Sequence, residues 1–236
     1  MSRDIQLRPY HYASVSGGKD SLKMLEVILA NPDRYPLDAV VHFELEIDYP
    51  FVKNVTARME EAVNKCGMPF MRIKPRVSFV ELYKKYGAPS RIRRWCNSAY
   101  KLDCKRQLDD WVKSMACRPI AYIGYCADET SRIKPSKSQY QIYPLVELGI
   151  VEDDILEWAK DQPIFDDFYK YHRRQGCWIC PLQPMKDLAY LRKFYPKKFD
   201  ILVNMAILAE QEHEPMFSHR TIGNIIKNLE RSKYKL

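Results

Sequence analysis

Short β-rich runs alternate with helical patterns through the first two-thirds of the 236-residue chain, and this alternation limits the fold more than any other feature. It predicts an α/β fold in which a parallel sheet is covered by helices on both faces, because parallel strands need long crossover connections. From Glu152 onward only helical patterns follow, which predicts a C-terminal helical cap. We therefore expect an α/β domain over residues 1–150 and a helical region over residues 151–236, packed on the same domain.

The bounds of the expected elements follow from residue type and spacing. Strands are expected over His11–Val15, Leu37–Phe43, Pro69–Ile73, Ile120–Tyr125 and Gln141–Val146. Helices are expected over Ser21–Ala30, Pro50–Lys65, Phe79–Tyr86, Asn97–Ser114, Asp153–Lys160, Phe165–Arg174, Met185–Phe194, Lys197–Glu212 and Ile222–Arg231. In a parallel sheet of this kind, ligands bind at the carboxyl ends of the strands.

Composition excludes several classes of protein. Hydrophobic residues make up 46% and charged residues 29%, so the chain can bury a core and is neither disordered nor fibrous. No run approaches the ~18 apolar residues of a membrane span, so no membrane partner is expected. Seven cysteines, an odd number, and a polar start without an export signal predict reduced thiols and a cytoplasmic location.

Positive charge is concentrated in the middle of the chain. The whole chain has 38 basic and 30 acidic residues, a net charge of +8. Residues 72–137 alone have 16 basic and 6 acidic residues, a net charge of +10. Such a surplus is typical of a segment that meets a polyanion or a phosphorylated ligand, and equally of a solvated basic face.

A glycine-rich loop, Ser16-Gly17-Gly18-Lys19-Asp20-Ser21, follows the first expected strand and opens the first expected helix. Its glycines allow close approach of the backbone to an anion, the helix N-terminus directs amides at it, and Lys19 adds positive charge. Asp20 is suited to hold Mg²⁺ at the phosphate oxygens, and both serine hydroxyls can donate hydrogen bonds. The spacing is not that of a Walker loop. We expect a phosphate-binding loop.

This loop resembles the signature of the PP-loop ATP pyrophosphatases, which have an adenine nucleotide alpha hydrolase-like fold and cleave ATP between the α and β phosphates. Further elements occur in the order of its phosphoadenosine phosphosulfate (PAPS) reductase-like branch. They are Gly87–Ser90, Arg93–Cys96 with Lys101, Gly124–Arg132, Pro144-Leu145 and Gly176–Pro181. The resemblance implies an adenine nucleotide as ligand, with Arg94, Lys101, Glu129 and Arg132 as additional nucleotide- or phosphate-binding residues.

The chain departs from that branch in ways that bear on its activity. Sulfonucleotide reductases of the branch usually have a degenerate phosphate loop and a C-terminal cysteine that attacks sulfur. Here the loop is intact and the last cysteine is Cys180, so the chain resembles the ATP-using members. Cys126 stands where the family often has an arginine, which removes one phosphate contact.

Four cysteines form a candidate metal site. Cys177 and Cys180 are spaced so that both thiolates can reach one metal, and the resemblance places Cys96 near them. Cys104 is the candidate fourth ligand, although a straight helix would put it ~12 Å from Cys96. Three interpretations stay open: a 4Fe-4S cluster, Zn²⁺ with these ligands or with His172, and thiols without metal.

The sequence predicts an enzyme that binds ATP with Mg²⁺ and adenylates an acceptor in sulfur metabolism or sulfur transfer, either sulfate or nucleic acid. Lys19 and Asp20 are the expected catalytic residues. One alternative is a PAPS reductase. Another is a non-catalytic nucleotide- or nucleic-acid-binding subunit of a larger assembly. The aromatic, basic C-terminal half fits either stacked nucleic acid or an aromatic core.

Overall fold

The computed structural model describes residues 7–133, 139–217 and 220–231. The chain forms two compact units that are interleaved along the sequence. The first, here called the sheet unit, comprises Met1–Glu44, Pro50–Lys74 and Cys104–Asp167. The second, here called the helical unit, comprises Leu45–Tyr49, Pro75–Asp103 and Phe168–Leu236.

The sheet unit contains a five-stranded parallel sheet with the strand order β3-β2-β1-β4-β5. Its strands are β1 (Arg8–Val15), β2 (Ala39–Phe43), β3 (Phe70–Ile73), β4 (Cys117–Tyr122) and β5 (Gln141–Ile142). The central strand, β1, pairs with β2 on one side and with β4 on the other. Its carboxyl end is therefore flanked by the loops that follow both neighbours, which is where a ligand is expected.

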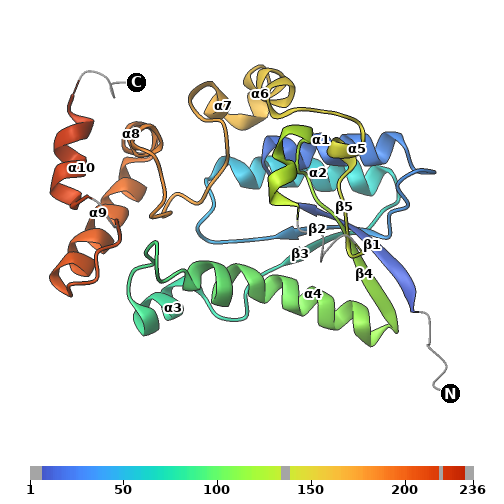
Figure 1. The fold of residues 1–236 in the computed structure, drawn as a ribbon, viewed down its shortest axis with the longest axis horizontal. Coiled ribbons are helices and arrows are strands. Elements are labelled where there is room, and N and C mark those ends of the chain that lie inside the picture. Colours follow the sequence, from blue (N-terminus) through green and yellow to red (C-terminus); the bar gives the residue numbers. More distant parts are fainter. Residues whose placement is uncertain (1–6, 134–138, 218–219, 232–236) are drawn as a thin grey trace. The chain divides into compact units, whose positions relative to one another are not determined.

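Helices cover both faces of this sheet, which confirms the expected fold class (Figure 1). Helices α1 (Lys19–Ala30) and α2 (Phe51–Lys65) lie on one face, and α4 (Leu102–Ser114) lies on the other. Under α4, Leu108 and Val112 pack with Tyr10, Val41 and Ala121 of three strands in one buried cluster. Strands buried on both faces carry near-continuous apolar runs, as β2 does with Ala39-Val40-Val41.

Short helices complete the sheet unit. They are α5 (Pro144–Glu147), α6 (Glu152–Lys160) and the 3₁₀ turns Ala127–Arg132 and Pro163–Phe165. The fifth strand was expected to reach Val146 but ends at Ile142, because Pro144 occupies the first turn of α5. The fourth was expected over Ile120–Tyr125 but spans Cys117–Tyr122, so the residues from Gly124 onward form a loop instead.

The helical unit is built from α3 (Phe79–Tyr86), a π-helical turn (Cys96–Lys101), α7 (Phe168–Tyr171), α8 (Met185–Phe194), α9 (Pro196–Gln211) and α10 (Ile222–Leu229). Its core is aromatic: the rings of Phe168 and His172 stack at 4.1 Å, and Tyr190 packs against both. These three side chains are buried, so they serve as core and do not offer a stacking surface for nucleic acid.

Two expected helices differ in detail. The helix expected over Phe165–Arg174 is broken, because Asp166 and Asp167 have φ values of 48° and 58°, outside the right-handed helical region. The helix expected from Asn97 begins with the π-helical turn before α4. Among the residues that the structure describes, no helix has both the length and the apolarity to cross a membrane.

The close packing of the glycine-rich loop on α2 can be measured with two matched substitutions. Gly17 and Gly67 both have positive φ, 76° and 71°, but only a Cβ at Gly17 would meet another side chain, at 2.8 Å from Val52 Cγ1. We expect Gly67→Ala to lower the free energy of unfolding by ~1–2 kcal/mol. Gly17→Ala is expected to lower it by a further ~1–3 kcal/mol, because the side chain overpacks the core. Equal losses in urea denaturation would show that the loop tolerates a Cβ.

Candidate nucleotide site

The glycine-rich loop lies at the carboxyl end of β1 and leads into α1. Its two serines hold it closed: the Ser16 amide donates to Ser21 Oγ at 3.2 Å, and that hydroxyl donates to the Gly18 carbonyl at 2.9 Å. Gly18 is the N-cap of α1 and supplies no side-chain cap. The first-turn amides therefore receive no capping side chain, which is the arrangement that binds anions at helix N-termini.

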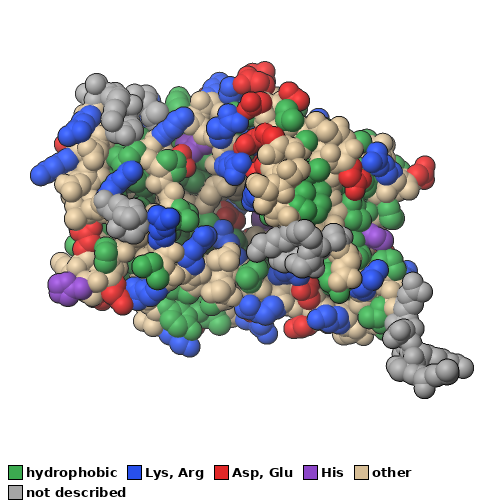
Figure 2. Space-filling model, viewed as in Figure 1, with side chains coloured by type: hydrophobic (Ala, Val, Ile, Leu, Met, Phe, Trp, Pro, Cys, Tyr) green, Lys and Arg blue, Asp and Glu red, His purple; other side chains and the backbone are tan. Residues whose placement is uncertain are grey.

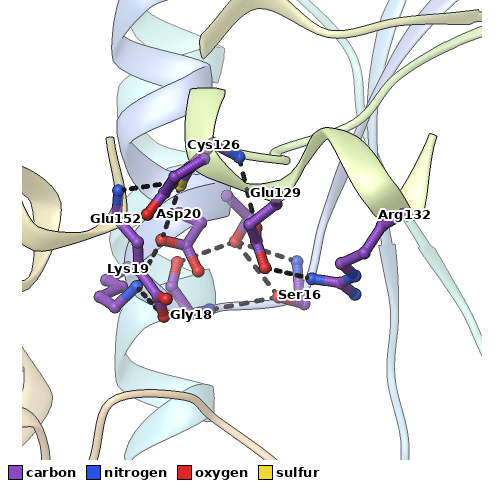
Figure 3. A network of polar contacts seen from close by, with 10 residues as sticks. Ser16, Gly18, Lys19, Asp20, Cys126, Glu129, Arg132 and Glu152 are labelled. Carbon is purple, nitrogen blue, oxygen red and sulfur yellow. Dashed lines mark hydrogen bonds and ion pairs between the residues drawn. The ribbon is translucent and has the colours of Figure 1, made fainter. Parts of the chain in front are cut away.

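Lys19 is completely buried at the start of α1. Its Nζ lies 2.5 Å from Asp20 Oδ1 and 3.4 Å from Glu152 Oε1, the latter contributed by the first residue of α6 (Figure 3). A buried ammonium group is stable only when carboxylates compensate its charge. The two contacts thus fix a positive charge directly under the loop.

Asp20 is half-buried in this network, and its pKa is raised. Burial is the largest cause, and the carboxylates of Glu152 and Glu129 add to it, whereas Lys19 opposes the shift. The thiol of Cys126 donates to Asp20 Oδ1 at 3.6 Å, and burial also raises the pKa of that thiol. Cys126 stands where the resembling family often has an arginine, and its neutral thiol donates a hydrogen bond to the Asp20 carboxylate.

The loop after β4 brings the other expected residues into the same site. A Cβ at Gly124 would lie 3.0 Å from the Asp20 carbonyl oxygen, so the two loops approach closely. Glu129 accepts hydrogen bonds from the Cys126 amide at 3.3 Å and from Arg132 Nη1 at 2.7 Å (Figure 3). The structure therefore brings Glu129 and Arg132 into the network around Lys19 and Asp20, and their binding of a nucleotide stays a prediction.

An aromatic pair borders this loop. The Arg132 guanidinium lies 4.2 Å from the centre of the Tyr125 ring, which is stacked on Tyr143 at 5.6 Å and 12°. Sequence reasoning did not find these two tyrosines, nor Glu152, because their roles depend on contacts distant in the sequence. The only available signal for Glu152 was its place in an acidic first helical turn, which is an ordinary feature of helix starts.

The charges of the site suit a divalent cation delivered with phosphate. Three carboxylates, those of Asp20, Glu129 and Glu152, face two cations, Lys19 and Arg132. In the described part of the chain, no three His, Cys, Asp or Glu side chains are grouped to hold a metal ion. Proteins commonly hold Mg²⁺ through one or two carboxylates while phosphates and water supply the other ligands, and Mg²⁺ at Asp20 stays a prediction.

Two of the expected nucleotide-binding residues, Arg94 and Lys101, lie in the helical unit. There Lys101 forms a hydrogen bond with Cys177, and electrostatic interactions link it to Asp48 and Cys180. Burial would lower the pKa of Lys101, but these partners raise it. Burial raises the pKa of Asp48 to about 7, against the influence of Lys101.

Three of the four expected metal ligands belong to this helical unit. Burial raises the pKa values of Cys96 and Cys177, both of which also interact with Cys180. Cys104 is buried at the start of α4 and belongs to the sheet unit. Among the described residues, no three His, Cys, Asp or Glu side chains are grouped to hold a metal ion, and the Cys177 sulfur already forms a hydrogen bond with Lys101. A 4Fe-4S cluster or Zn²⁺ at these cysteines stays a prediction.

Comparison with known proteins gives distant similarities. No family model matches the chain. Two uncharacterized proteins of Methanocaldococcus jannaschii, MJ0066 and MJ0973, are 26% and 24% identical to it over 84% and 81% of its length. These matches cover 42% and 46% of the two proteins, so the chain spans about half the length of the curated relatives it matches.

Two solved structures are also similar to the chain. One is a phosphoadenylyl-sulfate (PAPS) reductase from Candida auris in a phosphate complex, with 15% identity, a TM-score of 0.46, and coverage of 72% of this chain and 82% of that chain. The other is the U34-tRNA thiolase NcsA from Methanococcus maripaludis with its [4Fe-4S] cluster, with 17% identity, a TM-score of 0.40, and coverage of 96% and 83%.

Thiol reactivity tests the burial of the candidate site. Cys126 is fully buried with a raised pKa, whereas Cys66 is exposed at the end of α2. With iodoacetamide at neutral pH and mass spectrometry of the peptides, we expect Cys66 to be alkylated at least ~100 times faster, because the exposed thiolate is the nucleophile. Similar rates in folded protein would show that the Cys126 thiol is accessible and not held against Asp20.

Proposed function

We propose that this chain binds ATP with Mg²⁺ and cleaves it between the α and β phosphates to adenylate an acceptor in sulfur metabolism or sulfur transfer. One observation carries the proposal: a fully buried, charge-compensated Lys19 lies beneath an intact Ser-Gly-Gly-Lys-Asp-Ser loop at a helix N-terminus without a side-chain cap. Backbone amides and an ammonium group, which suit phosphate oxygens, thus lie beside a carboxylate that suits Mg²⁺, and a polyphosphate that carries Mg²⁺ needs both kinds of group.

In the proposed reaction an oxygen of the acceptor attacks the α-phosphorus in line. A new oxygen–phosphorus bond forms while the bond from that phosphorus to the α–β bridging oxygen breaks, and pyrophosphate leaves with the bonding electrons. Lys19 and the first-turn amides of α1 stabilise the charge on the departing phosphates, because they are already in place before the reaction. Mg²⁺ would be held by Asp20 and by phosphate oxygens, and would screen the same charge.

The loop after β4 supplies the second half of the site. Glu129 orients Arg132 through their 2.7 Å contact, and a guanidinium is suited to bidentate binding of phosphate oxygens. Tyr125 offers a ring beside it. The proposed acceptor is sulfate or a group on nucleic acid. Contacts of Arg94 and Lys101 with the nucleotide stay predictions.

A second candidate function is sulfonucleotide reduction. The observation that favours it is the hydrogen bond between Lys101 and Cys177, which places a cation beside a Cys-x-x-Cys pair. In that case the nucleotide would be PAPS, and the sulfur chemistry would use the thiols of the helical unit.

Charge removal at Lys19 tests the proposed reaction. Lys19→Gln keeps the length of the side chain and a hydrogen-bond donor for the carboxylates but deletes the ammonium charge. We expect pyrophosphate release from ATP to fall at least ~100-fold, because a preorganised charge is lost at the departing phosphates. Lys53→Gln, a matched change at an exposed lysine of α2, should leave the rate unchanged. Circular dichroism verifies that both variants fold, and full activity of Lys19→Gln would refute the assignment.

Ligand-induced stabilisation distinguishes the two candidate functions. In anaerobic thermal melts, we expect ATP with Mg²⁺ to raise the melting temperature of the wild-type protein, because a ligand that binds only the folded state stabilises it. Lys19→Gln should lose most of that shift. A larger shift with PAPS than with ATP would favour the reductase instead. Iron and zinc contents of the same anaerobic preparation test the predicted metal at the cysteines.

A further inference from the structure

An open pocket in the helical unit shares no residue with the network around Lys19, although it includes Arg94, one of the expected nucleotide-binding residues. Its volume is about 590 Å³. It is lined by Lys85, Tyr86, Ile92, Arg93, Arg94, Trp95, Asn97 and Ser98, from the end of α3 to the π-helical turn. Three of these side chains are cations, and none is an acid. The pocket therefore favours an anionic ligand over a neutral one.

Several hydrogen-bond donors on this pocket have no protein acceptor. In the described part of the chain, neither the Arg94 guanidinium nor the Lys85 ammonium has an ion-pair partner. Trp95 is 93% buried, since its exposed fraction is 7%, yet its indole N–H has no hydrogen-bond partner among the same residues. A buried donor without an acceptor costs ~1–3 kcal/mol. A ligand rich in acceptor oxygens would satisfy the Arg94 and Lys85 cations, whereas the indole nitrogen has no accessible surface for it to reach.

The same pocket presents exposed apolar surface. Tyr86 is 39% exposed and Ile92 is 90% exposed, and the rings of Tyr86 and Trp95 lie 6.1 Å apart. Figure 2 shows Lys and Arg side chains bordering a hydrophobic patch over α3. The segment that carries the pocket, Pro75–Asp103, has seven basic and two acidic residues, a net charge of +5. Among the residues that the structure describes, Arg93 is the one pocket cation with an acidic partner, Glu214 at 2.5 Å.

We propose that this pocket binds a nucleotide unit of a single-stranded nucleic acid. The backbone phosphate would accept from Arg94 and Lys85, and the base would lie against the exposed Tyr86, whose ring centre is 5.1 Å from the Lys85 ammonium. Cations combined with an accessible aromatic ring are what sequence-tolerant binding of single strands requires. The basic surplus of the surrounding segment favours a polyanion, with many phosphates, over a free nucleotide with one group of them.

The test is fluorescence anisotropy of labelled 12-nucleotide RNA and DNA single strands at graded salt concentrations. We expect wild-type protein to bind with a dissociation constant that rises steeply with salt, since each phosphate contact releases counterions. Arg94→Gln and Lys85→Gln should each weaken binding and lower the slope of log Kd against log salt by about 0.7. Tyr86→Leu should weaken binding about 5- to 100-fold through lost stacking, with little change of slope.

Two further variants separate the pocket from the phosphate loop and from general charge. Lys197→Gln removes an exposed positive charge at the start of α9, outside the pocket, and should bind like wild type. Lys19→Gln should also retain strand binding while losing stabilisation by ATP.

Three outcomes would overturn the proposal. The first is no measurable binding of either strand at low salt. The second is equal weakening by Lys197→Gln and the pocket variants, which would mean a diffuse electrostatic attraction. The third is competition by a free mononucleotide at the concentration where the 12-nucleotide strand competes, which would assign the pocket to a small phosphorylated ligand. Failure of the ATP reaction would not affect these results, because the ATP reaction is tested by the charge of Lys19, whereas strand binding is tested at Arg94, Lys85 and Tyr86 of the pocket.

Discussion

The buried ion pairs of Lys19 with Asp20 and Glu152 are the constraint on which the candidate site depends. A single ammonium joins the first turn of α1 to the first residue of α6, two elements that are 133 residues apart in the sequence. Removing one partner of a buried pair leaves an uncompensated charge and typically costs ~3–5 kcal/mol. The ion pair from Lys19 to Glu152 therefore ties the start of α6 to the glycine-rich loop. A cation that binds Asp20 would compete with Lys19 for that carboxylate, and so would alter the ion pairs that hold α6.

The strand order explains why the loop after β4 meets the phosphate loop. Because β4 pairs with β1 in parallel, the two strands end at the same edge of the sheet. Gly124 then permits an approach that a Cβ would obstruct at 3.0 Å from the Asp20 backbone. Glu129 and Arg132 both lie in the 3₁₀ segment that follows Gly124, Ala127–Arg132, which places their side chains at the site. The site is thus a consequence of which strands are neighbours, and not of any one motif alone.

Much of this could be predicted from residue patterns, because local preferences agreed with the fold. The buried apolar run of β2 indicated the parallel sheet, and the Ser-Gly-Gly-Lys-Asp-Ser turn was placed correctly between the first strand and the first helix. The family resemblance singled out Glu129 and Arg132, which lie in the same network, and phosphate binding by these residues stays a prediction. What could not be predicted depends on tertiary contacts. No local signal assigns Glu152 to Lys19, or the Tyr143 ring to Tyr125. The break at Asp166 and Asp167 was also missed, although aspartate is a weak helix former and adopts positive φ more readily than most residues.

The two proposed anion sites differ in whether acidic side chains neutralise their cations. This difference indicates whether each site accepts phosphate with or without a bound metal ion. In the phosphate loop, Lys19 already faces two carboxylates, so the local charge is negative until a divalent cation arrives with the phosphates. In the pocket of the helical unit, Arg94 and Lys85 have no acidic partner among the described residues, so phosphate needs no accompanying metal there. Strand binding should therefore persist when Mg²⁺ is chelated, whereas ATP binding should weaken. The same ligand atoms, phosphate oxygens, would be recognised in one chain by two different electrostatic arrangements.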